Sequence, residues 1–240
     1  MFMMMDPSYM LLSVVGMGLV FLPQLWVKNT VATYKKVDAR SGMTGEELAR
    51  TILRRHNIED VAIQAIEGEL TDHYDPGAKA VRLSADNFYG RSISGLAIAA
   101  HECGHAIQHA TGYVPVVIRG KMAPVVGLGS QFGPMLLMIG IGLGAASAAA
   151  PAFSTLIAWL GVAVFSAAVA FHMVTLPVEF NASSRALAVL ETGGYLTSDE
   201  MTGAKKVLTA AAMTYVATAM YSLMELVYWV LRLVGGRSRD

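Results

Sequence analysis

Four apolar stretches separated by polar segments set the pattern of this 240-residue chain. They lie at residues 8–27, 124–150, 153–175 and 207–231. The first is about 20 residues long, the length at which a helix crosses the apolar core of a bilayer. The other three are at least as long, and only the last contains an acid, Glu225, so that it need not cross completely. The pattern therefore predicts a mainly α-helical, integral-membrane bundle of three to four spans.

Two details support the membrane interpretation of these stretches. A cleaved signal peptide would be the alternative for residues 8–27, but residues 1–7 contain no Lys or Arg and no small-x-small cleavage site follows. In the second stretch, Gly129-x-x-x-Gly133 and Gly140-x-x-x-Gly144 have the spacing that lets membrane helices approach closely. We therefore expect the second stretch to pack tightly against a neighbouring span.

The polar segment after the first stretch predicts a small α+β part. Thr44, followed by Glu46 and Glu47, predicts a helix start, because a hydroxyl cap and acids in the first turn stabilise a helix N-terminus. Short strands and a hairpin turn follow, at residues 61–66, 69–74 and 80–83 and at Asp75-Pro-Gly.

The sequence AAHECGHAIQHA at residues 99–110 contains the candidate metal ligands and the candidate catalytic base. A helix is expected over Ser92–Ala110, with Ser92 or Ser94 as N-cap and Gly112 as stop. In such a helix His101 and His105 lie on one face, one turn apart, where they can bind a single ion. Glu102 lies beside the first histidine, the position of the general base in zinc hydrolases. A pair of ordinary helical histidines is the alternative. The lone Cys103 points to the opposite side, and we interpret it as buried packing.

A catalytic zinc needs a third protein ligand and an open position. The candidates are Glu179, His109, His172 and His73. We favour Glu179 because it begins an amphipathic helix that can pack antiparallel to the histidine helix, whereas His109 would require three ligands from one straight helix. An acid stabilised in a first helical turn is the alternative for Glu179. His172 and His73 have structural alternatives of their own, a hydrogen bond to a neighbouring helix and local turn bonding.

The chain accordingly divides into five segments. These are an N-terminal membrane helix (1–27), a catalytic part with the hairpin and the histidine helix (28–121), a membrane hairpin (122–176), a third-ligand region (177–206) and a C-terminal apolar helix with a basic tail (207–240). Eighteen basic and eighteen acidic residues give no net charge, so nothing indicates a nucleic-acid partner.

The distribution of basic residues predicts the orientation. Nothing basic precedes the first span, whereas four basic residues follow it, at Lys28, Lys35, Lys36 and Arg40. The positive-inside rule then places residues 28–121 in the cytoplasm. A hairpin of spans with its turn near Pro151 returns Glu179 to the same side as His101. If the fourth stretch crossed fully, the three arginines that follow it would lie outside, against the rule.

Four sequence segments resemble the YugP-like family of bacterial membrane zinc metallopeptidases, of the neutral zinc metallopeptidase type. They are Leu70-Thr-Asp-His-Tyr-Asp-Pro, Val81-Arg-Leu-Ser, Ala100-His-Glu-Cys-Gly-His-Ala-Ile-Gln and Pro177-Val-Glu-Phe-Asn-Ala-Ser-Ser-Arg-Ala-Leu. With the arrangement of spans, the likeness covers nearly the whole chain. It implies zinc on His101, His105 and Glu179, with Glu102 as catalytic base.

A more distant likeness is to the membrane peptidases of the HtpX and CAAX-processing type. Their second motif is Glu-x-x-Ala-Asp, whereas this chain has Glu179-Phe-Asn-Ala182-Ser183, with serine in place of the aspartate. Ser183, Asn181 or a main-chain carbonyl is then left to orient a ligating imidazole.

Together these observations predict a gluzincin-like zinc metallopeptidase with a small zincin-like catalytic part. It would hydrolyse a peptide or protein substrate at the lipid bilayer of a bacterial cell (inner) membrane, with its active site on the cytoplasmic side. The main alternative is a catalytically inactive, zinc-stabilised membrane scaffold or adaptor, against which Glu102 argues, because a structural site needs no base. A transporter is a third interpretation, but apart from Glu225 and His172 the spans lack the charges of an ion path. The pattern leaves the substrate and the oligomeric state open.

Overall fold

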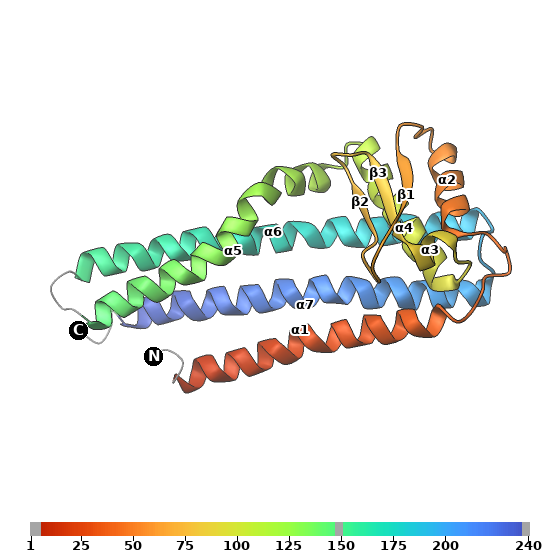
Figure 1. The fold of residues 1–240 in the computed structure, drawn as a ribbon. Coiled ribbons are helices and arrows are strands. Elements are labelled where there is room, and N and C mark those ends of the chain that lie inside the picture. Colours follow the sequence, from red (N-terminus) through yellow and green to blue (C-terminus); the bar gives the residue numbers. More distant parts are fainter. Residues whose placement is uncertain (1–5, 147–150, 237–240) are drawn as a thin grey trace. The chain divides into compact units, whose positions relative to one another are not determined.

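The computed structural model describes residues 6–146 and 151–236. In chain order its elements are α1 (Pro7–Tyr34), α2 (Gly45–Arg55), β1 (Ala62–Ile66), β2 (His73–Asp75), β3 (Ala80–Ser84), α3 (Ala85–Tyr89), α4 (Ile93–Ala110), α5 (Val114–Ala146), α6 (Pro151–Thr192) and α7 (Ser198–Gly236) (Figure 1). The predicted fold class is confirmed, since the described chain is mainly helical with one small sheet.

Three helices, α1, α6 and α7, are each long and apolar enough to cross a membrane. α5 supplies a fourth span if its two pieces, Val114–Pro124 and Gly129–Gly144, are taken together across a bend of 54°. Pro124 ends the first piece, and a proline inside a helix removes a hydrogen bond and favours a bend. The described residues therefore contain three to four candidate spans, as the apolar pattern predicts.

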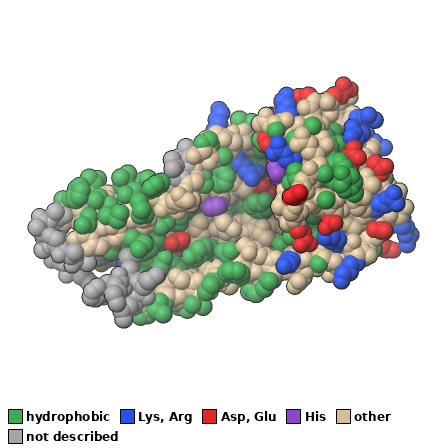
Figure 2. Space-filling model, viewed as in Figure 1, with side chains coloured by type: hydrophobic (Ala, Val, Ile, Leu, Met, Phe, Trp, Pro, Cys, Tyr) green, Lys and Arg blue, Asp and Glu red, His purple; other side chains and the backbone are tan. Residues whose placement is uncertain are grey.

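The chain forms two compact units. The first comprises Met1–Phe21, Ile118–Thr175 and Val216–Asp240, and the second comprises Leu22–Val117 and Leu176–Tyr215. On the face drawn in Figure 2, charged side chains gather over the sheet and α2, which belong to the second unit. The parts of α5 and α6 that belong to the first unit present mostly hydrophobic side chains there.

In the first unit, α5 and α6 pack through glycines. A Cβ atom added at Gly133 would lie 2.7 Å from the Cβ of Phe165, and one added at Gly140 would overlap the backbone of Ala158. Such distances leave no room for a side chain, so the close approach expected from the glycine spacing is confirmed.

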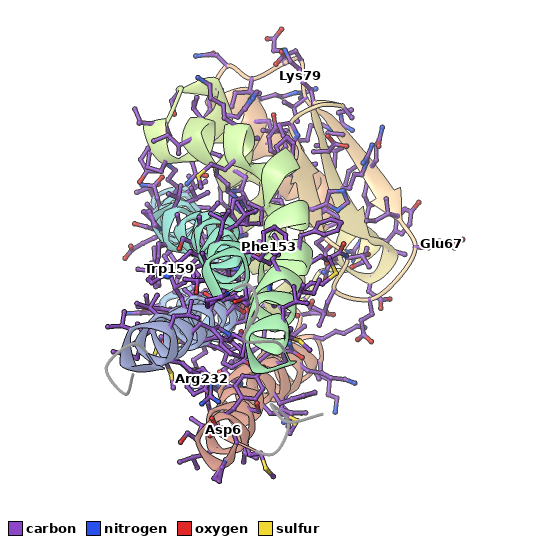
Figure 3. All side chains as sticks on the ribbon, turned by 90° about the vertical axis from the view of Figure 1, so that its left-hand side faces the viewer. Asp6, Glu67, Lys79, Phe153, Trp159 and Arg232 are labelled. Carbon is purple, nitrogen blue, oxygen red and sulfur yellow. The ribbon has the colours of Figure 1, made fainter. Side chains whose placement is uncertain are left out.

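The start of α1 and the end of α7 meet in the same unit. Asp6 accepts a hydrogen bond of 3.0 Å from the Tyr228 hydroxyl and forms an ion pair with Arg232 (Figure 3). The rings of Tyr9 and Trp229 pack with their centroids 5.2 Å apart. Polar and aromatic contacts thus join the first and last described helices.

The second unit contains the sheet, whose strand order is β1-β3-β2. β2 and β3 form the expected antiparallel hairpin, and β1 runs parallel to β3. Glu67 and Lys79 mark opposite ends of this sheet (Figure 3). The strand predicted over residues 69–74 is wrong in extent, because β2 begins only at His73. Gly68 and Leu70, at φ of 99° and 57°, hold the preceding backbone in the left-handed region, which a strand cannot use.

Two helices of this unit begin as the sequence predicts. Thr44 and Glu47 form a capping box at the start of α2. Ser92 caps α4, its hydroxyl accepting from the Gly95 amide at 3.1 Å. α4 ends at Ala110, and Gly112 follows with a φ of 62°. α4 packs on α2 and lies in the main hydrophobic cluster, to which it contributes Leu96, Ala97, Ala100 and Ala106.

The expectation that a separate helix begins at Glu179 is wrong. α6 continues without interruption from Pro151 to Thr192 and carries Pro177 in its interior. A proline there costs one backbone hydrogen bond. Buried side chains pack the helix on both sides of that position, those of Val169 and Thr175 before it and those of Val178 and Ala182 after it. The turn expected near Pro151 falls on residues 147–150, outside the described residues.

Candidate metal centre

His101 and His105 project from one face of α4. Their Nε2 atoms lie 3.2 Å apart, as an i, i+4 spacing on a helix allows. The two rings meet edge to face, with centroids 4.7 Å apart. Their side chains are only 14% and 12% exposed, so the pair is largely withdrawn from water.

α6 brings a carboxylate to this pair. Oε2 of Glu179 lies 3.3 Å from Nε2 of His101 and 3.5 Å from Nε2 of His105. Within the described residues these three side chains form the one cluster whose donor atoms are close enough to share a metal ion, all within 4.8 Å of one another. Glu179 lies 74 or more positions after the two histidines in the sequence, so only the packing of α6 on α4 brings it to them.

The close approach of α4 and α6 depends on Gly104, between the two histidines. A Cβ atom at this position would lie 2.7 Å from the carbonyl oxygen of Ala182 and 3.2 Å from its Cα. The two helices run antiparallel here, because His101 contacts Ser183 whereas Gln108, further along α4, contacts Val178. The antiparallel packing expected from the sequence is therefore observed, although the helix itself begins much earlier.

The other ring nitrogens are held by hydrogen bonds away from the centre. Nδ1 of His101 lies 3.2 Å from the Ser183 hydroxyl, and Nδ1 of His105 lies 3.0 Å from Oε1 of Gln108. The Gln108 amide nitrogen donates to the Val178 carbonyl at 2.8 Å and to Oδ1 of Asn181 at 3.0 Å. Because both donors of Gln108 are used, its Oε1 must accept, and His105 carries its proton on Nδ1. The lone pair of neutral His105 therefore lies on Nε2, facing His101 and Glu179.

Glu102 is buried, with an exposed fraction of 7%, and it lines a cavity of about 190 Å³ together with His101 and Glu179. Among the described residues, no side chain forms a hydrogen bond or ion pair with its carboxylate. This acid is thus placed beside the histidine pair with its oxygen atoms uncommitted.

Comparisons with known proteins identify the family to which this arrangement belongs. A family model described as "Putative neutral zinc metallopeptidase" matches residues 9–234. The chain is 44% identical over 232 residues to a Bacillus subtilis (strain 168) protein described as "Putative membrane protease YugP", covering 97% of this chain and 99% of the relative. This chain belongs to the neutral zinc metallopeptidase family. No solved structure shows significant similarity to it.

Zinc, the metal implied by this family, fits the donor set. Two imidazole nitrogens and a carboxylate oxygen converge at 3.2–3.5 Å, and lone pairs at such distances repel unless a positive charge lies among them. Imidazole and carboxylate are usual zinc ligands, and a set of three is the number found in catalytic sites. The hydrogen bonds to Nδ1 of both histidines are of the kind that orients zinc-binding rings.

Two ionisable side chains on α4 have shifted pKa values. Burial lowers the pKa of His105, but the hydrogen bond that its protonated ring donates to Glu179 and the charges of Glu102 and Glu179 outweigh burial, so the net shift is upward. Burial raises the pKa of the Cys103 thiol, and the charge of Glu102 adds to this shift. Cys103 is fully buried against α2, where its sulfur lies 3.7 Å from the Ala49 carbonyl, as expected for a packing residue.

The remaining histidine candidates lie outside the cluster. Nδ1 of His73 bonds the Thr71 carbonyl at 2.8 Å, and the His109 ring contacts Tyr74 on the hairpin. His172 belongs to the other unit, where its ring packs on Phe171.

Sequence reasoning missed Gln108 and Gly104. The signal for Gln108 was its place three residues after His105, one helical turn along the same face. The signal for Gly104 was a residue of low helix propensity in the middle of an expected helix.

Proposed function

We propose that this chain is an integral-membrane, zinc-dependent peptidase that hydrolyses peptide bonds. In this proposal His101, His105 and Glu179 hold zinc, and Glu102 is the general base. The observation that carries it is the convergence of three metal-binding side chains beside a buried, uncommitted carboxylate at the wall of a cavity. Membership of a zinc metallopeptidase family supports the same chemistry.

Zinc, when bound, supplies a Lewis acid that lowers the pKa of water and polarises a carbonyl group. Glu102 accepts a proton from the attacking water at a carboxylate oxygen. As the carbon–nitrogen bond breaks, Glu102 passes that proton to the leaving amine, so that protons balance over the cycle. The burial of Glu102 shields the transferred proton from bulk solvent.

The remaining polar side chains orient the ligands. Gln108 fixes the His105 ring and its tautomer, and Ser183 holds the His101 ring from α6. Asn181 in turn holds the Gln108 amide. Such outer contacts raise the basicity of ligating imidazoles and keep them in place.

The proposal places the active site on the cytoplasmic side of a bacterial cell (inner) membrane. The support is the group of basic residues that follows the first apolar stretch, which the positive-inside rule assigns to the cytoplasm. The membrane setting itself follows from the candidate spans and from the membrane protease to which the chain is similar.

The decisive experiment compares Glu102→Gln with the wild type as full-length proteins in detergent. Zinc content is measured by metal analysis, and turnover is measured on a quenched fluorescent peptide. We expect about one zinc per chain in both proteins, with a loss of turnover of roughly 10²–10⁴-fold in the variant, the range for removal of a general base.

The matched control is Glu67→Gln, an exposed acid on the loop after β1, which should leave both quantities unchanged. Equal turnover in Glu102→Gln and wild type would exclude Glu102 as the base. Zinc binding without any turnover in the wild type would favour the inactive scaffold instead.

A further inference from the structure

The cavity beside Glu102 has walls that the peptidase chemistry does not use. It lies within the second unit. Apart from His101 and Glu102 of α4 and Thr214 and Tyr215 of α7, its lining from α1, α4 and α7 is an aliphatic wall made of Val27, Val31, Ile98, Val207, Leu208, Ala211 and Ala212. Within the described part of the chain, no Lys or Arg lines it. A wall of this composition excludes a charged group unless that group finds a partner.

Apart from Glu102, the polar side chains at the cavity already have partners. Asp72 accepts from the Ser84 amide at 2.7 Å and from the Asn87 amide nitrogen at 2.9 Å, so it is occupied with holding the hairpin to α3. The Thr214 hydroxyl donates to the Ala211 carbonyl within α7. The Glu102 carboxylate has the proton-transfer role proposed above. Ser183 holds the His101 ring, and Tyr215 also has a partner. The aliphatic wall itself offers no polar group to a substrate side chain.

From this composition we infer that the cavity receives an apolar side chain of the substrate, at a position flanking the scissile bond. This inference rests on the proposed function, since it needs a peptide at the metal centre. The aliphatic wall adjoins the metal centre, because His101, Glu102 and Glu179 line the same cavity. A side chain in the cavity thus lies next to the groups that act on the peptide bond.

The size of the cavity narrows the class of side chain. Its volume of about 190 Å³ exceeds the roughly 150 Å³ of an engineered apolar cavity that binds benzene. Leucine, methionine and phenylalanine side chains therefore fit, whereas glycine and alanine leave most of it unfilled. Filling an apolar pocket with one further methylene changes the rate by roughly tenfold or more.

The first test measures kcat/KM of the full-length, zinc-loaded protein on quenched peptides that differ only at the residues flanking the scissile bond. We expect a leucine or phenylalanine peptide to exceed the glycine peptide by at least about tenfold, and lysine and glutamate peptides to fall below glycine. Cleavage of all of these peptides at similar rates would overturn the cavity assignment while leaving the peptidase function intact.

Filling the cavity from its own wall provides the second test. Ala211→Phe should reduce the leucine-over-glycine preference to about twofold, because the new ring occupies the space of the substrate side chain. Val27→Phe narrows the cavity from α1 and serves if the first variant does not fold. Thr209→Phe is the matched control, since this exposed α7 residue does not line the cavity, and the preference should be unchanged. An undiminished preference in both cavity variants would overturn the assignment.

A binding measurement separates failure of this inference from failure of the proposed function. Leucine hydroxamate and glycine hydroxamate, which both chelate zinc, are titrated into zinc-loaded Glu102→Gln protein, in which turnover is not needed. Leucine hydroxamate should bind at least about tenfold more tightly, and Ala211→Phe should abolish the difference. A preserved difference, together with a zinc-loaded wild type that cleaves no peptide, would reject peptidase activity and support the cavity. Equal binding of both hydroxamates would reject the cavity.

Discussion

α6 packs against glycine-bearing helices in two regions, and the two contacts do different things. In the first unit, Gly129 and Gly133 of α5 face Ala168 and Phe165, and the contact is between apolar surfaces. In the second unit, Gly104 of α4 faces the Ala182 backbone. This contact lies beside the cluster of His101, His105 and Glu179.

This difference sets how accurately each contact must be made. Apolar surfaces can slide by a few tenths of an ångström at modest cost, since dispersion is spread over many atoms. In the second region the same shift would change three donor distances of 3.2–3.5 Å at once. We therefore expect the second contact to be the sensitive one, with metal binding as its readout.

The largest effect is expected from Glu179→Ala. Removing the carboxylate leaves two histidines, fewer ligands than any stable catalytic zinc site uses, so zinc per chain should fall from about one to well below half. Metal analysis of the detergent-purified variant beside the wild type checks this. Full zinc retention would contradict the assignment of Glu179 and reopen the choice among His73, His109 and His172.

Gln108→Ala should come next, because it frees the His105 ring and its tautomer. Loss of such an outer contact typically weakens metal binding by roughly 10–100-fold, and competition with a zinc chelator measures it. Gln64→Ala removes a glutamine from β1 that bonds only Arg82 among the described residues and should leave zinc affinity unchanged. Equal affinities in the two variants would show that the His105 ring is held without Gln108.

The glycine contacts can be compared directly with one matched pair of variants. Gly104→Ala puts a carbon 2.7 Å from the Ala182 oxygen, so α6 must shift, and zinc affinity should fall by about tenfold. Gly129→Ala meets the Val164 oxygen at 3.1 Å in the other region and should leave zinc affinity unchanged, although both changes lower thermal stability. Zinc loss of the same size in both variants would remove the distinction between the two contacts.

The smallest effect near neutrality is that of pH. Zinc binds the unprotonated imidazole, and the raised pKa of His105 in the metal-free protein means that protons compete already above the ordinary range of histidine. Zinc affinity should therefore be constant at high pH. Once the pH drops below the pKa of His105, the affinity should fall by up to about tenfold per pH unit. Titrations of the metal at pH 8 to 5 measure this slope, and a flat profile over that range would contradict it.

The local parts of this centre could be predicted from the sequence, because a helix fixes its own geometry. The spacing of His101 and His105 and the cap at Ser92 are properties of one short segment, and the structure shows both. Glu179 was chosen by ligand chemistry from among four candidates, and its role as a ligand stays a prediction, although its side chain does lie beside the pair.

Other features depend on tertiary contacts that no local pattern records. The sequence analysis expected a helix to begin at Glu179, yet α6 runs through Pro177 without a break. Buried side chains before and after the proline, such as Thr175 and Val178, keep the helix continuous. Ser183 and Asn181 were both possible partners of a ligating ring. In the structure the Ser183 hydroxyl bonds His101, whereas Asn181 accepts from Gln108, a residue that sequence reasoning did not single out.

The burial of Cys103 has a practical consequence for mapping the molecule. It is the only cysteine of the chain, and it is protonated and inaccessible where α4 packs on α2. A cysteine introduced at any exposed position would therefore be the one thiol that reacts with a maleimide, with no need to remove the native one. Membrane-impermeant labels on such single-site variants can then report, residue by residue, which side of the bilayer each segment faces.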